Sequence, residues 1–211
     1  QRLAAAPCPT YRCRRGIRTI LVGEIGVGAG CTPMLDWLLA CQVPYLVSAG
    51  FSGALHPDYR VGEIIVGTEI VDAESHVWPT TWPASELPPG LRSDRLLSVN
   101  SVVGTPTLKM KLAQDFQAGA VDMETATIAR HCTAAGVPFG CIRVISDTMQ
   151  TSISPRLVSL IETGGISTPQ LAWNILRSPK LVPELWRLAR DTNMAARCLA
   201  DALIHLLAVT G

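Results

Sequence analysis

The chain has 211 residues and a mass of 22.6 kDa, a length that favours one domain over two. Lysine and arginine number 18 against 17 for aspartate and glutamate, so the formal net charge of +1 gives no bulk attraction to nucleic acid, and we expect no nucleic-acid partner. Charged residues are only 17% and hydrophobic residues 48%, which excludes a disordered chain and predicts a homodimer or larger homo-oligomer.

Apolar, β-branched runs alternate with stretches of helical period, which predicts a single α/β domain with a central mixed, largely parallel sheet flanked by helices. Residues 1–18 are expected to be irregular and 19–211 to form the domain. The expected strands are, in chain order, 19–23, 45–49, 61–71, 96–103, 120–123 and 139–145. The expected helices are 33–41, 106–116 and 125–135, followed by helical structure over 155–207. The connections are a glycine-rich turn at 24–30, a loop at 50–55 and an irregular, proline-rich excursion at 73–95 with Trp78 and Trp82 exposed.

Residues 1–15 and the apolar runs are expected to hold neither a signal peptide nor a membrane span. No run is apolar over the roughly 20 residues that a membrane span needs, and residues 1–15 lack the apolar core of a signal peptide. We therefore expect a cytoplasmic protein. The seven cysteines are odd in number and form no CxxC pair, which predicts reduced cysteines and no metal site. Five of them lie in apolar runs and are expected to be buried: Cys31, Cys41, Cys132, Cys141 and Cys198.

The glycine-rich turn runs from Gly26 through Gly28 to Gly30 in the pattern GxGxG. Cys31 stands where the third glycine of a dinucleotide-binding GxGxxG would lie, and no GK[ST] follows, so neither a Rossmann site nor a P-loop is indicated. Two interpretations stay open. The turn is a tight strand-to-helix connection, or its backbone N–H groups, at Gly26 and Gly28 above all, face a ligand.

Two segments end an apolar strand with a carboxylate. AVDMETATIAR (120–130) presents Glu124, and CIRVISDT (141–148) presents Asp147. Ligands of open parallel sheets bind at the carboxyl ends of the strands, so the two side chains are candidates for one site. Each also has a structural alternative, since Glu124 suits the first turn of a helix and Asp147 suits a helix N-cap.

The same segments carry a resemblance. Residues 120–148, with a Met-Glu pair, a helix of small residues, a Val-Pro turn and a strand ending Arg-x-Ile-Ser-Asp, resemble the signature of the purine nucleoside phosphorylase / methylthioadenosine-S-adenosylhomocysteine nucleosidase superfamily. Residues 46–66 resemble its glycine loop and following strand, with Glu63 in place of the usual aspartate. The tail, ISPRLVSLIETGG and the segment after it, is similar to the subgroup linked with hopanoid biosynthesis.

The resemblance implies cleavage of the N-glycosidic bond of a purine nucleoside, a small-molecule partner, without metal or organic cofactor. Glu124 would accept the ribose hydroxyls and stabilise the cationic sugar, and Asp147 would protonate or hydrogen-bond the purine N7. Met123 would pack beneath the ribose and Ser146 would orient the acid. The loop that lines base and sugar would comprise Gly50, Phe51, Ser52 and Gly53.

The chain departs from the family pattern in two respects. The first strand, which in nucleosidases carries the water-activating glutamate, has no counterpart in residues 1–18; Glu24 is either its substitute or a solvated turn acid. No arginine lies beside the glycine loop in residues 48–52, which favours hydrolysis over phosphorolysis, where phosphate would be a co-substrate. Arg143 is either a phosphate ligand or a structural residue. A nucleoside-binding protein without turnover also remains open.

Overall fold

The computed structural model describes residues 1–25, 28–82, 91–162 and 181–209. It begins with a hairpin of β1 (Thr10–Arg15) and β2 (Arg18–Gly23), which pair antiparallel from Thr10 opposite Gly23 to Arg15 opposite Arg18. The expectation that residues 1–18 are irregular is therefore wrong for residues 10–15, which form β1. Gly16 has a φ of 57°, the left-handed conformation that a two-residue hairpin turn requires.

The main sheet contains β3 (Leu46–Ala54), β4 (Ile64–Asp72), β5 (Val77–Pro79), β6 (Arg92–Ser98), β7 (Ala120–Asp122) and β8 (Phe139–Asp147). Its order is β5-β4-β6-β7-β3-β8, and β4 also pairs with β8, so the described strands other than β5 close into a ring. The pairs β3–β8, β4–β6 and β6–β7 are parallel, whereas β3–β7, β4–β5 and β4–β8 are antiparallel. The predicted mixed sheet is confirmed.

Strand β3 is longer than expected and absorbs the predicted loop at 50–55. Its residues Leu46 to Gly53 pair with β8, and Gly53 and Ala54 pair with β7. Ladder hydrogen bonds on both sides hold the backbone extended, although glycine alone weakens a strand. Gly50, Phe51, Ser52 and Gly53 are consequently strand residues in the closed part of the sheet.

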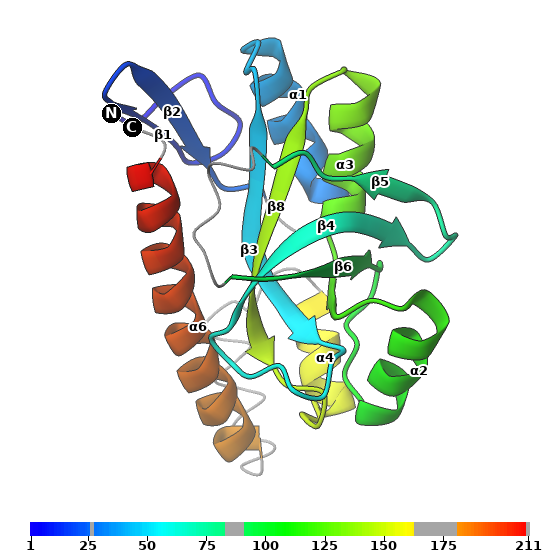
Figure 1. The fold of residues 1–211 in the computed structure, drawn as a ribbon. Coiled ribbons are helices and arrows are strands. Elements are labelled where there is room, and N and C mark those ends of the chain that lie inside the picture. Colours follow the sequence, from blue (N-terminus) through cyan, green and yellow to red (C-terminus); the bar gives the residue numbers. More distant parts are fainter. Residues whose placement is uncertain (26–27, 83–90, 163–180, 210–211) are drawn as a thin grey trace.

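The helices are α1 (Thr32–Ala40), α2 (Pro106–Phe116), α3 (Thr125–Ala134), α4 (Pro155–Glu162) and α6 (Leu181–Val209), with a 3₁₀ turn η1 (Gly28–Cys31) before α1. Figure 1 shows α6 along one side of the sheet, where it packs on β8, β3 and β4, and α1 and α3 on the other side. The expected helical structure over 155–207 is present in α4 and α6, and its part between 163 and 180 lies outside the described residues.

Helix and sheet pack through two apolar clusters. The larger joins α1 and α3 to the sheet and includes Leu35, Ile65, Ile128 and Phe139. The smaller includes Leu55, Leu97 and Val121, and the apolar face of α2 packs against it. The short side chains of Ala129 and Cys132, both fully buried on α3, let that helix lie close to the sheet.

The expected irregular excursion at 73–95 instead contains β5 and the start of β6, and residues 83–90 lie outside the described part. Trp78 is half-buried against the larger core cluster because β5 pairs with β4. Trp82 is half-buried as well, with its ring edge-on to Tyr45 at 6.5 Å between centroids. The prediction that both tryptophans are exposed is wrong.

Within the described ranges, no helix combines the length and the apolar character needed to cross a membrane.

Candidate active site

Asp147 ends β8, where its carboxylate contacts polar groups of β8 and α2 and lies beside Gly53 of β3. The Ser146 hydroxyl lies 2.9 Å from Oδ1 of Asp147 and 3.2 Å from the carbonyl oxygen of Ser52. Gly53 lies opposite Asp147 in the β3–β8 ladder, and a Cβ at Gly53 would come within 3.1 Å of Oδ2. The structure therefore brings four of the predicted site residues together: Ser52, Gly53, Ser146 and Asp147.

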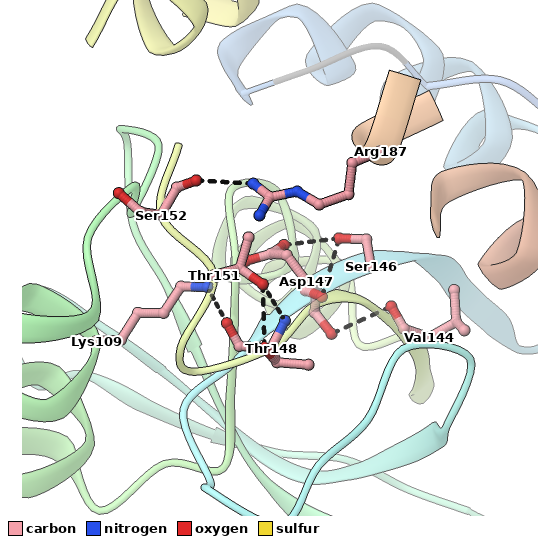
Figure 2. A network of polar contacts seen from close by, with 9 residues as sticks. Lys109, Val144, Ser146, Asp147, Thr148, Thr151, Ser152 and Arg187 are labelled. Atoms are coloured by element: carbon pink, nitrogen blue, oxygen red, sulfur yellow. Dashed lines mark hydrogen bonds and ion pairs between the residues drawn. The ribbon is translucent and has the colours of Figure 1, made fainter. Parts of the chain in front are cut away.

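Lys109 is a neighbour of Asp147 that the sequence analysis missed. Its Nζ forms an ion pair with Oδ2 of Asp147 and donates to the carbonyl oxygen of Thr148 at 2.7 Å, and the lysine side chain is fully buried. Figure 2 shows Lys109 reaching from α2 toward this strand end. The available signal was helical spacing: Lys109 shares a face with Leu112, Ala113 and Phe116, which pack on the smaller core cluster.

Residues 148–152 continue the chain beyond the acid in a closed turn. The Thr148 backbone N–H donates to Thr151 Oγ1 at 3.1 Å, and Arg187 of α6 donates to the Ser152 carbonyl oxygen at 3.0 Å (Figure 2). The predicted alternative for Asp147, an N-cap directly after the strand, does not apply, since the next helix, α4, begins at Pro155.

Glu124 stands at the N-cap position of α3, immediately after the short strand β7 and Met123. Its charge reaches the 3₁₀ turn η1: burial raises the pKa of the Cys31 thiol, and the negative charge of Glu124 raises that pKa further. Packing of α3 against η1 thus places Glu124 beside the glycine-rich turn that contains Gly28. Gly26 lies outside the described residues.

Arg143, weighed above as a phosphate ligand, is a buried structural residue. Its guanidinium lies 2.8 Å from Oδ2 of Asp122 and also donates to Ser48 and Thr125, and the arginine and aspartate side chains are 3% and 1% exposed. Burial alone would lower the pKa of Arg143, but neighbouring negative groups, Asp122 among them, outweigh it and raise that pKa. The cluster ties β8, β3 and the start of α3 together.

The remaining predicted contacts are distributed along β3. Gly50 lies opposite Arg143 in the ladder, and a Cβ there would meet the guanidinium at 3.6 Å. Phe51 is 42% exposed, so an aromatic ring is available on the outer side of this strand. Glu24 is exposed directly after β2, and its role as a base stays a prediction.

Among the described residues, Asp72, Glu74 and His76 form a group that could offer three ligand atoms to a cation, all within 4.8 Å of one another. The group is explained by the turn between β4 and β5. Asp72 Oδ1 accepts from the backbone N–H groups of Glu74 and His76 at 3.0 and 2.8 Å. Burial would raise the pKa of Asp72, but these bonds and His76 lower it.

A hollow of about 510 Å³ lies beside α2, lined by residues that include Leu55, His56, Gln114 and Met149. Its volume suits a small ligand. Asp147 is two residues from Met149 but neither it nor Glu124 lines the hollow, so the chemistry-bearing carboxylates define the candidate site and the hollow does not.

Known proteins resemble this chain in both sequence and fold. The model of the phosphorylase superfamily matches residues 83–161. The 5'-methylthioadenosine/S-adenosylhomocysteine nucleosidase of Geobacillus kaustophilus is 24% identical over 192 residues, which cover 76% of this chain and 80% of that protein.

Two solved structures from Helicobacter pylori share the fold. The 5'-methylthioadenosine/S-adenosyl homocysteine nucleosidase, in complex with a substituted pyrrolidin-3-ol, has a TM-score of 0.71 at 18% identity and covers 98% of this chain and 87% of its own. Native futalosine hydrolase has a TM-score of 0.72 at 17% identity, with the same coverage of 98% and 87%.

The closed mixed sheet, with Asp147 as the last residue of β8 and Glu124 two residues after β7, belongs to an α/β domain whose fold the two solved structures share. The chain is similar to the phosphorylase superfamily over residues 83–161, and the relatives compared above carry the names of nucleosidases and of a futalosine hydrolase.

Proposed function

We propose that this protein hydrolyses the N-glycosidic bond of an adenosine-like nucleoside. The observation that carries the proposal is the placement of two carboxylates at the ends of β7 and β8, Glu124 at the start of α3 and Asp147 among Ser146, Gly53 and Lys109. β7 runs antiparallel and β8 parallel to β3, so the two carboxyl ends do not meet at one edge as expected for parallel strands. The two strands instead share Gly53 of β3, which lies opposite Val121, three residues before Glu124, and opposite Asp147 itself. The nucleosidase relatives support the same reaction.

The reaction needs a group that helps the base leave and a group that stabilises the sugar. When the C1′–N9 bond breaks, its electron pair goes to the base, and Asp147 supplies a proton to N7 so that the base leaves neutral. The ribosyl group gains positive charge, which the carboxylate of Glu124 stabilises more in the transition state than in the ground state. Water then adds to C1′ and loses a proton to solvent. No metal or organic cofactor enters this scheme.

The burial and the hydrogen bonds of Arg143 favour hydrolysis over phosphorolysis. This arginine could have held phosphate, but Asp122, Thr125 and Ser48 occupy its guanidinium and the side chain is 3% exposed. Arg143 is therefore not available to bind the phosphate that the second candidate reaction, phosphorolysis, requires.

Base release from adenosine, 5′-methylthioadenosine and inosine, measured by chromatography with and without phosphate, tests the proposal. We expect adenine and a free sugar at a rate that phosphate does not change. Asp147→Asn should lower kcat by about 10²–10⁴-fold, the range of a general acid. Formation of a sugar 1-phosphate that requires phosphate would instead assign a phosphorylase, and adenine binding without any release would assign a binding protein.

We also propose that the protein is a cytoplasmic homo-oligomer. A second proposal rests on the resemblance of the tail to the subgroup linked with hopanoid biosynthesis: the group at the sugar 5′ position of the substrate is hopanoid-like. The low charged fraction of 17% supports the oligomer. Sedimentation at micromolar concentration should show a species larger than 22.6 kDa; a monomer alone would contradict the expectation. Comparison of methylthio and longer apolar 5′ substituents as substrates addresses the second point.

A further inference from the structure

Lys109, the fourth residue of α2, is a fully buried cation at the end of β8. Lysine is almost never fully buried unless it is paired, because removing an ammonium group from water is costly. Here its Nζ contacts the carboxylate of Asp147 and the carbonyl oxygen of Thr148 (Figure 2). The buried ammonium group thus has two oxygen acceptors, and one of them belongs to the residue that the proposed reaction uses as its acid.

The position of Lys109 is fixed by the rest of its helix. Thr105 caps α2 by accepting from the Leu108 N–H at 3.3 Å, and Pro106 occupies the first turn, so the start of the helix is defined. One turn further on, Leu112, Ala113 and Phe116 pack on the smaller core cluster. The face that carries Lys109 therefore cannot turn away from β8 without exposing apolar side chains.

Asp147 is held from two sides by these neighbours. Lys109 contacts Oδ2 and the Ser146 hydroxyl lies at Oδ1, while the absence of a side chain at Gly53 leaves room for the carboxylate. A carboxyl group fixed at both oxygens presents one orientation to a bound base. Such pre-organisation matters because a displacement of about 1 Å can cost about 10²-fold in rate.

We propose that Lys109 is the positioning residue of Asp147: it fixes the orientation of the acid and stabilises the carboxylate that forms when the proton of Asp147 passes to the leaving base. The inference rests on the proposed function and adds to it a residue that neither the sequence motifs nor the comparisons assign.

The proton balance is simple. The Asp147 carboxyl gives its proton to N7 as the C1′–N9 electron pair moves to the base, and Asp147 becomes a carboxylate. Lys109 keeps its three protons throughout and lies against the new negative charge. In a buried site this attraction is stronger than at the surface, so it favours the transition state. After the base leaves, Asp147 takes up a proton from solvent.

The test compares Lys109→Met with the wild type on two leaving groups. On an adenine nucleoside that the wild type cleaves, kcat should fall by about 10²-fold with little change in KM. On 4-nitrophenyl β-D-ribofuranoside, whose phenolate departs without a proton, the rate should stay near that of the wild type. Lys109→Gln serves for the same comparison if the methionine variant does not fold.

A second arm restores the cation. In Lys109→Ala the side chain beyond Cβ is missing, and added n-propylammonium should recover part of the rate, whereas n-propanol should not. Lys111→Met is the matched control, because Lys111 is an exposed lysine on the same helix. Its removal should leave the rate of cleavage of both substrates unchanged.

Two results would overturn the inference. One is a Lys109→Met variant with near wild-type kcat on the adenine nucleoside. The other is a loss that is equal for both leaving groups and is not rescued by n-propylammonium, which would make Lys109 a structural residue only. Failure of the proposed function itself is distinct, since the wild type would then release no base from any nucleoside.

Discussion

Arg143 and Asp122 form a buried ion pair with 2.8 Å between Nη2 and Oδ2, which joins β8 to the residue just before Met123 and Glu124. Asp122 also accepts from the Thr125 N–H at 3.3 Å, in the first turn of α3. The pair thus fixes the backbone on both sides of Glu124. The pair therefore ties the segment that leads into Glu124 to β8, the strand that ends in Asp147.

Removing one member of this pair should destabilise the fold. Arg143→Met leaves Asp122 charged and buried, which is expected to lower the free energy of unfolding by about 3–5 kcal/mol. Urea titration followed by circular dichroism measures the change. Arg190→Met, which breaks an ion pair whose arginine is 62% exposed, is the control and should cost less than about 1 kcal/mol. Equal stability of the two variants would show that the buried pair is dispensable.

Gly53 should be required for the geometry of the acid. A Cβ at this position would lie 3.1 and 3.4 Å from the carboxylate oxygens of Asp147, so Gly53→Ala should displace the carboxylate and lower kcat by about 10²-fold. Steady-state kinetics of Gly53→Ala and the wild type provide the comparison, and similar kinetics would contradict the steric argument.

The sequence predicted the elements whose ends carry local signals. Helix α2 begins and ends as expected because Thr105 caps it, Pro106 suits its first turn and Gln117 takes a left-handed φ of 49° after it. The carboxylates at the strand ends could also be located, since an apolar run followed by an acidic residue is recognisable in the sequence. These signals lie within a few residues of the feature that they predict.

Features that depend on partners distant in sequence could not be predicted in this way. Gly50 and Gly53 led to the prediction of a loop at 50–55, whereas their pairing with β7 and β8 makes them part of strand β3. The residues next to Lys109 in sequence do not identify its partner, because Asp147 is 38 residues away. Trp78 reads as an exposed aromatic until the pairing of β5 with β4 places it against the core.

The cysteines should differ widely in reactivity. Burial raises the pKa of Cys132 and of Cys141 to about 11, so at pH 8 only about one thiol in a thousand at these positions is the reactive thiolate. Cys13 and Cys41 are exposed; for Cys41 this corrects the expectation of burial. Iodoacetamide followed by peptide mass mapping should show modification at Cys13 and Cys41 and protection at Cys132 and Cys141 until urea unfolds the chain. Early alkylation of Cys141 would mean that the core opens locally.

Glu124 should be needed for turnover and not for folding. Glu124→Gln keeps the shape of the side chain but removes the negative charge that the cationic sugar requires, so kcat should fall by about 10²–10³-fold. The thermal unfolding transition should stay within a few degrees of the wild type, because the Asp122–Arg143 pair that holds the start of α3 is intact. The control is Glu74→Gln, which changes an exposed carboxylate in the β4–β5 turn and should be fully active.

Glu124→Gln and Lys109→Met should also differ in their rates on 4-nitrophenyl β-D-ribofuranoside. Loss of Glu124 should slow the cleavage of this substrate too, since departure of every leaving group requires a cationic sugar. A Glu124→Gln enzyme with near wild-type rates would remove Glu124 from the mechanism.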